Sequence, residues 1–276
     1  MRHRVMKDPI ASDKHSSKKK RYTEHIEQTH RQGKLRNATI DSDCVQFSFC
    51  FLGTVVLEWC CNPGSLIARY SRRIPHTKAV RLGLHNIDLA DAVQVAKLRR
   101  MGSQYLVSNG ALRVFVSIPC TCWCKMQSLN VHQHGKAFED RLQRERQHSQ
   151  HMMRLFLSTY RQWKRESPTK VSGAFEWPQN FGWDSDKNSD ITGLLKTLPY
   201  NALFDGCAFG LKYKGRYLKK PWRIATDHVR LAAALDGQLC RGDHSHAGTI
   251  GKAAKASESY PPRLAQCITD AFLEAL

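Results

Sequence analysis

Residues 51–65 of the chain read FLGTVVLEWCCNPGS, and this stretch decides the fold class. Its first nine residues form a continuous β-branched and apolar run, which is typical of a strand buried on both faces of a parallel sheet. The CCNPGS that follows predicts a turn, and LIARYSRR after it predicts a helix start capped by Ser65 or Asn62. A buried strand, a short turn and a helix in this order indicate an α/β protein.

The same alternation continues along the chain. Further strands are predicted at residues 78–84, 112–118 and 173–178, and a strand or hairpin at 203–217. Helices are predicted at residues 90–101, 137–166 and 229–235, and after Tyr260. Strands that alternate with helices predict a doubly wound, mostly parallel sheet. We therefore expect a Rossmann-like core with a small C-terminal extension.

Charge and length set the domain organisation. The chain has 276 residues, with 43 Lys and Arg against 24 Asp and Glu, and a formal net charge of +19. Residues 1–40 predict a basic disordered tail, 41–205 the Rossmann-like core, and 206–276 the rest of the same domain. The part after the tail is itself basic, so the charge predicts a polyanionic partner: nucleic acid, with DNA favoured over RNA.

Composition excludes two classes of protein. Ten cysteines in 276 residues are too few for a secreted disulfide scaffold. The longest apolar stretch, residues 45–57, is shorter than the ~18–20 residues that cross a bilayer. The N-terminal residues are basic but lack the apolar segment of a signal peptide. We expect an intracellular protein, nuclear or cytoplasmic, with reduced cysteines and no membrane partner.

Three predicted loops leave strand ends with reactive side chains, and ligands of open α/β sheets bind outside those ends. Glu58 ends the first strand ahead of a small-residue turn, which suits a nucleotide-like cofactor. Cys120 follows a proline in SIPCTCWC, which suits a rigidly presented nucleophilic thiolate. Glu176 lies in FEWP, where a carboxyl group among aromatic rings can give or hold a proton. We expect all three loops to line one crevice.

Each of these residues also has a plainer interpretation. Glu58 can simply cap the helix that follows it. Cys120, Cys122 and Cys124 can bind a metal ion together or pack in the core. Glu176 can be a surface residue beside a structural tryptophan.

The order of the three motifs resembles a known family. Glu-Trp-Cys-Cys-Asn-Pro-Gly-Ser is similar to the cofactor loop of class I S-adenosylmethionine-dependent methyltransferases, and Ser-Ile-Pro-Cys-Thr and Phe-Glu-Trp-Pro resemble motifs of the DNA cytosine-5 methyltransferases. The resemblance implies methyl transfer to cytosine C5, with Cys120 as the nucleophile at C6 and Glu176 as the partner of N3. It implies S-adenosylmethionine as the cofactor, held by Glu58, Cys60, Asn62, Gly64, Ser65, Asp88 and Pro119.

Departures from the family pattern keep a second hypothesis open. The loop CCNPGS has one glycine, and the second strand ends in RLGLH, without an acid to hold the ribose hydroxyls. The alternative is a non-catalytic nucleic-acid-binding protein on a degenerate methyltransferase scaffold.

The C-terminal third carries two further candidate sites. Cys240, His244 and His246 form C-x3-H-x-H, and Cys207 or Cys267 could complete a tetrahedral Zn²⁺ site. The alternative is a polar loop that contacts nucleic acid or solvent. The segment KKPWR combines positive charge with an aromatic ring, which suits contact with a nucleic-acid strand. Its candidate contact residues are Lys219, Lys220, Trp222 and Arg223.

Overall fold

The computed structural model describes residues 52–273 except 62 and 185, so the predicted tail lies outside the described residues. Six strands form one sheet in the order β2-β1-β3-β4-β8-β5. β1, β2, β3 and β4 run parallel, and β8 is antiparallel to both of its neighbours. The strands are β1 (Thr54–Trp59), β2 (Thr77–Leu82), β3 (Ala111–Val116), β4 (Val171–Pro178), β5 (Tyr200–Asp205) and β8 (Pro221–Thr226). A mostly parallel sheet is confirmed.

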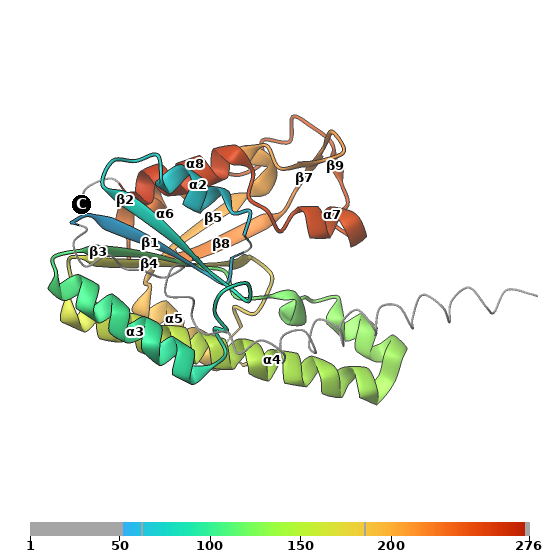
Figure 1. Ribbon diagram of the computed structural model, residues 1–276. Helices are drawn as coiled ribbons and strands as arrows, with labels where there is room; N and C mark the ends of the chain where they lie inside the picture. The colour runs from blue at the N-terminus through green and yellow to red at the C-terminus, as the bar shows by residue number, and fades with distance from the viewer. Residues whose placement is uncertain (1–51, 62, 185, 274–276) are drawn as a thin grey trace, which may run out of the picture. The chain divides into compact units, whose positions relative to one another are not determined.

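Helices cover both faces of this sheet (Figure 1). One face carries α3 (Ala92–Val107), α4 (Gln127–Glu166) and α5 (Asp190–Thr197). The other face carries α2 (Leu66–Ser71), α6 (Val229–Leu235) and α8 (Pro262–Leu273). The fold is therefore a three-layer α/β arrangement with helices on both faces, as the sequence predicts. Among the helices of the described residues, none has the length and apolarity needed to cross a bilayer.

Alternation along the strands assigns each side chain to one of the two cores. In β1, Leu57 and Trp59 pack against the α3, α4 and α5 layer, whereas Val56 packs in the opposite core. In β4, Phe175 and Trp177 pack in the same core as Trp59. Every residue of β4 is buried. The continuous apolar runs in the sequence arise because both faces of these strands are covered.

Two elements differ from the sequence prediction. α4 begins at Gln127, ten residues before the predicted start, and it kinks at Gly135, where φ is 67°. The left-handed backbone there is a conformation that glycine adopts at little cost. The predicted strand at residues 203–217 is split into β5, a 3-10 turn η2 (Gly206–Phe209), and the short strands β6 (Lys212–Tyr213) and β7 (Arg216–Leu218).

A second, small sheet lies at one end of the α2, α6 and α8 layer (Figure 1). It has the order β6-β7-β9, where β9 is His246–Ala247. The chain continues from β9 into α7 (Gly251–Ala256) and then into the segment that precedes α8.

Candidate active site

The three predicted loops line one cavity of about 430 Å³ at the carboxyl ends of β1, β3 and β4. Nine of the predicted site residues contribute to its lining: Glu58, Cys60, Gly64, Ser65, Pro119, Cys120, Glu176, Lys220 and Trp222. The walls also include residues that sequence reasoning did not single out: Ser117, Lys255, Glu258, Ser259 and Tyr260. Cys120 and Tyr260 lie about 60 and about 200 residues after Glu58 in the chain, yet all three line the same cavity. This convergence is expected at the carboxyl ends of strands in an open α/β sheet.

Glu58 is buried next to the first turn of α2. One carboxylate oxygen accepts a short hydrogen bond from Ser65 Oγ, and the other accepts one from the Ala68 backbone N–H at 2.9 Å. Burial raises the pKa of Glu58 above its ordinary value, although both hydrogen bonds and the nearby Arg81 act in the opposite direction. Glu58 therefore performs the capping role of the plainer interpretation while it also lines the cavity.

Cys60 directly follows β1 with a φ of 64°, in the left-handed region. A residue with a Cβ adopts this conformation at a cost of about 1–2 kcal/mol. The strained residue lies in the loop that the resemblance assigns to the cofactor. Strain of this kind concentrates at sites where the backbone approaches a ligand.

Hydrogen bonds from β4 and α4 hold the loop that carries Cys120. Trp177 Nε1 donates to the Ile118 carbonyl at 2.6 Å, and Arg146 Nε on α4 donates to the Cys122 carbonyl at 3.1 Å. Trp123 is buried, and its Nε1 donates to Ser149 Oγ at 3.0 Å. Cys122 points into the core, so the alternating cysteines do not share one environment. These contacts hold the Pro-Cys turn in a defined position.

Cys120 is a thiol, not a thiolate, near neutral pH. Burial raises its pKa to about 12, and the negative charge of Glu176 acts in the same direction. The positive charge of Lys220 lowers the pKa in part. The expected thiolate is therefore not preformed, and a nucleophilic role requires the proton to leave when a ligand binds.

Glu176 is held by two hydroxyl groups from distant segments. Ser117 Oγ donates to Glu176 Oε2 at 2.7 Å, and Tyr260 OH donates to the same oxygen at 2.5 Å. Both hydroxyl groups bind Oε2, so Oε1 is the carboxylate oxygen that neither of them contacts. The side chain is 5% exposed, so Glu176 is not the surface residue of the plainer interpretation. Ser117 lies two residues after Phe115, so both side chains point to the same face of the sheet. Glu176 is the neighbour of Ser117 on the adjacent chain segment, one residue beyond the Val116–Phe175 pair, and points to that face as well.

Asp88 is the described candidate cofactor residue that does not line the cavity. Asp88 is exposed beyond its edge, where its carboxylate accepts a hydrogen bond from the Ala90 N–H at 2.9 Å. Burial is the main cause of the raised pKa of Cys60, and the negative charge of Asp88 adds to it, so Asp88 lies near the loop that follows β1. Asn62 lies outside the described residues.

The KKPWR segment corresponds to the start of β8 and the residues before it. Trp222 is 1% exposed, packs against Phe204 and Tyr260, and lines the cavity, so its ring does not lie on the outer surface. Lys220 Nζ donates to the Ser257 carbonyl at 2.8 Å and lines the cavity. Lys219 and Arg223 lie outside the cavity lining.

The C-terminal cysteine and histidine residues also come together. The described residues contain one group of at least three side chains that could hold a metal ion: Cys207, Cys240, His244 and His246. Cys207, and not Cys267, is the fourth member of the group. Cys267 lies on α8, where its Sγ contacts the Ala234 carbonyl.

Comparison of the chain with protein-family models, with curated proteins and with solved structures gives no match in any of the three. Functional inference for this chain therefore depends on its residues and their geometry.

Proposed function

We propose that the protein is an S-adenosylmethionine-dependent methyltransferase that acts on nucleic acid, with cytosine C5 of DNA as the acceptor. The observation that carries the proposal is the convergence of Glu58, Cys120 and Glu176 on one cavity at the carboxyl edge of the sheet. The mostly parallel six-stranded sheet, with β8 reversed between β4 and β5, is compatible with the Rossmann-like core that the proposal requires.

The cavity fits the cofactor in part. Its volume of about 430 Å³ lies within the range of small-molecule sites, roughly 300–1,000 Å³. Trp59 and Trp222 line it, and their buried indole N–H groups have no acceptor among the described residues. Lys255 and Glu258 also line it, and they form an ion pair with each other at 2.6 Å. Asp88, which the resemblance places by the adenine, does not line the cavity.

S-adenosylmethionine supplies an electrophilic methyl group when it is bound. Cys120, which lines the cavity, would attack C6 of a base that enters it, and flipping would bring the target base out of the duplex into this pocket. Its proton must leave first, and Lys220 favours the thiolate that remains. Glu176 must carry a proton on Oε1 to bind N3 of the base, because both atoms are otherwise acceptors, and Ser117 and Tyr260 fix the orientation of the carboxyl group through Oε2.

A transfer assay with labelled S-adenosylmethionine tests the proposal on DNA and RNA of matched sequence. We expect label in DNA with the full chain, and a loss of at least about 10²-fold in Cys120→Ser and Glu176→Gln. Cys267→Ser and Glu166→Gln, which lie away from the cavity, serve as matched controls. Absence of cofactor binding in calorimetry would reject the cofactor, whereas full activity of Cys120→Ser would reject only the covalent cytosine mechanism.

The protonated Cys120 and the exposed Asp88 favour a second candidate function. On this alternative the protein binds nucleic acid without catalysis on a methyltransferase scaffold. It predicts salt-dependent binding of DNA or RNA that is unaffected by S-adenosylhomocysteine. Tighter binding in the presence of S-adenosylhomocysteine would exclude it in favour of the methyltransferase.

A further inference from the structure

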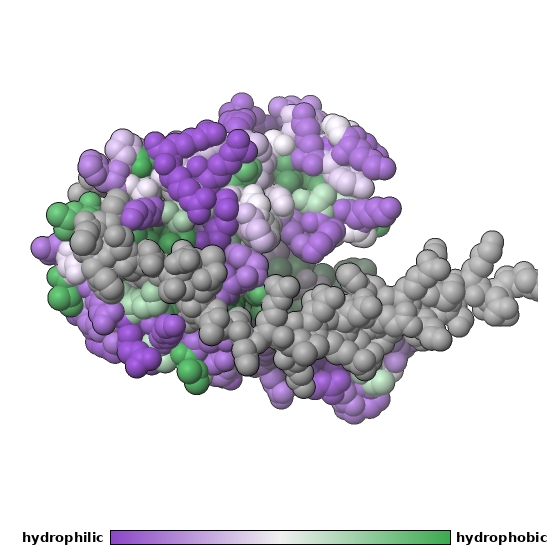
Figure 2. Space-filling view, viewed as in Figure 1, coloured by the Kyte–Doolittle hydropathy of each residue, from purple (hydrophilic) through white to green (hydrophobic). Residues whose placement is uncertain are grey.

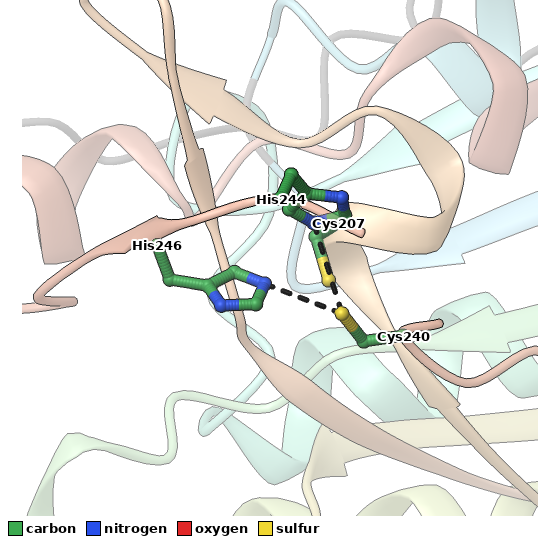
Figure 3. Close-up of side chains that lie close together, drawn as sticks. All are labelled: Cys207, Cys240, His244 and His246. Atoms are coloured by element: carbon green, nitrogen blue, oxygen red, sulfur yellow. Dashed lines mark hydrogen bonds between the residues drawn. The ribbon is translucent and has the colours of Figure 1, made fainter. Parts of the chain in front are cut away.

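Four side chains from three segments converge on one point away from the cavity (Figure 3). Cys207 comes from η2, Cys240 follows α6, and His246 belongs to β9, with His244 just before it. One potential ligand atom from each residue lies within 4.8 Å of the others. The Cys240 sulfur lies 3.7 Å from His244 Nε2 and 3.4 Å from His246 Nε2.

These distances match a tetrahedral ion. Zn–S bonds of about 2.3 Å and Zn–N bonds of about 2.0–2.1 Å place sulfur and nitrogen about 3.6 Å apart around a tetrahedral centre. Two cysteines and two histidines form a ligand set that is typical of Zn²⁺. Mg²⁺ and Ca²⁺ prefer oxygen ligands instead.

Neighbouring residues orient the candidate ligands. Asp243 Oδ1 lies 2.6 Å from His244 Nδ1, the ring nitrogen opposite the one that faces Cys240. A carboxylate on the far nitrogen is the usual partner of a metal-bound histidine. The Gly242 N–H donates to the Cys240 sulfur at 3.4 Å, and a φ of 75° at Gly242 turns the chain back toward it. Tyr217 stacks on His244 with ring centroids 4.0 Å apart.

We propose that Cys207, Cys240, His244 and His246 bind one Zn²⁺ ion in a closed, structural site that braces the wall of the cavity. Four protein ligands leave no open coordination position, which distinguishes a structural zinc site from a catalytic one. The proposal does not depend on methyl transfer.

The bracing role follows from the small sheet around the site. Its strands β6, β7 and β9 have only two, three and two residues, and so few backbone hydrogen bonds do not hold a sheet by themselves. The chain runs from β9 through α7 to Lys255, Glu258 and Tyr260, which line the cavity. A metal ion that links η2 to β9 therefore fixes the start of the segment that forms this wall.

Metal analysis of the full chain, purified without chelator, tests the site directly. We expect about one zinc ion per chain, and after chelation and Co²⁺ addition the visible absorption of a tetrahedral cobalt–thiolate centre. Cys240→Ser and His246→Asn should lose the ion, and Cys267→Ser should keep it. Asp243→Asn should weaken zinc binding by about 10–100-fold. A metal-free chain, a Cys207–Cys240 disulfide, or equal loss in Cys267→Ser would overturn the proposal.

Hydrogen exchange with and without chelator tests the bracing role. We expect residues 238–260 to lose protection when zinc is removed, while β1, β3 and β4 retain theirs. The wild-type chain is used in both states, so the result does not depend on how any variant folds. Unchanged exchange in residues 238–260 after complete zinc removal would show that the ion does not brace the wall.

Discussion

Cys60 combines an unfavourable backbone conformation with a position in the loop between β1 and α2, which lines the cavity. Its φ of 64° is one that glycine adopts freely, and the loop has glycine only at position 64. The cost of this conformation falls on Cys60 itself, because any residue with a Cβ meets the following carbonyl oxygen in the left-handed region.

Substitution at this position should show the strain directly. We expect Cys60→Gly to be more stable than Cys60→Ala by about 1 kcal/mol, measured as the free energy of unfolding in urea. Both variants lose the sulfur, so their difference reports the backbone. The neighbouring Cys61 has no positive φ and serves as the control, where the order should reverse. Equal stability of the two Cys60 variants would contradict the left-handed conformation.

Alkylation of Cys120 should reveal its raised pKa of about 12. The thiolate reacts and the thiol does not, so the rate at neutral pH should be slow and should rise through alkaline pH. Glu176→Gln removes a negative charge that raises this pKa, so it should lower the pKa and accelerate alkylation. Burial is the larger cause, and the rate should stay below that of an ordinary thiol. Peptide mass spectrometry after iodoacetamide measures the rate at each pH.

Glu166→Gln is the control for that experiment, because it removes the same charge away from the cavity. Glu166 lies at the end of α4 and accepts a hydrogen bond from the Gln162 side chain. Its Cys120 alkylation rate should equal that of the wild-type chain. A Cys120 that reacts as fast at pH 7 as at pH 9 would show that the thiolate is already formed.

Candidate site residues at strand ends could be predicted individually, but their partners could not. Glu58, Cys120 and Glu176 stand out in the sequence because each is a reactive residue after an apolar run. Ser117 precedes Cys120 by three residues, yet only the alternation of β3 places it beside Glu176. Tyr260 reaches Glu176 from 84 residues away, and the packing before α8 decides that contact.

At the scale of the element, continuous apolar runs predict β1, β3 and β4 because both faces of these strands are buried. The sequence does not predict β8, because PWRIAT begins with proline and its apolar run is interrupted by an arginine. Its reversed direction depends on the path of the chain from β5 through η2, which no local pattern encodes. Gly135 lies just before the predicted helix start at residue 137, so the kink and the ten residues of α4 before that start were not predicted.

The contact between α3 and α4 depends on a glycine. A Cβ at Gly102 would lie 2.5 Å from the buried ring of Trp163 on α4. That ring cannot move freely, because its Nε1 donates to the Arg99 carbonyl at 2.9 Å. We expect Gly102→Ala to lower the free energy of unfolding by about 1–3 kcal/mol, measured in urea.

Gly193→Ala on α5 is the matched control. Its Cβ would meet the end of the Arg161 side chain at 3.2 Å and Leu157 Cδ1 at an ordinary contact distance of 3.9 Å. Alanine favours the helix by about 0.5–1 kcal/mol, so this variant should be neutral or stabilising. A Gly102→Ala variant as stable as Gly193→Ala would contradict the close crossing of the two helices.

At the scale of the whole molecule, the formal net charge of +19 is the dominant electrostatic feature. Hydrophilic side chains cover most of the described surface visible in Figure 2, and apolar side chains form only small patches there. A surface of this kind favours a charged partner over an apolar one. Charge, however, reports the affinity for polyanions and not the chemistry performed on them.

Nucleic-acid binding by the full chain should therefore depend strongly on salt. Contacts with six phosphates would lower the affinity for duplex DNA about 10³-fold between 50 and 200 mM salt. Lys219, about half exposed at the end of the KKPWR segment nearest the small sheet, is a candidate for one of these contacts. Lys219→Ala should reduce the slope of log affinity against log salt by about 0.9, equally for all sequences. Lys196→Ala, exposed on α5, should leave the slope unchanged. Fluorescence anisotropy over a salt series measures both slopes, and equal slopes would remove Lys219 from the interface.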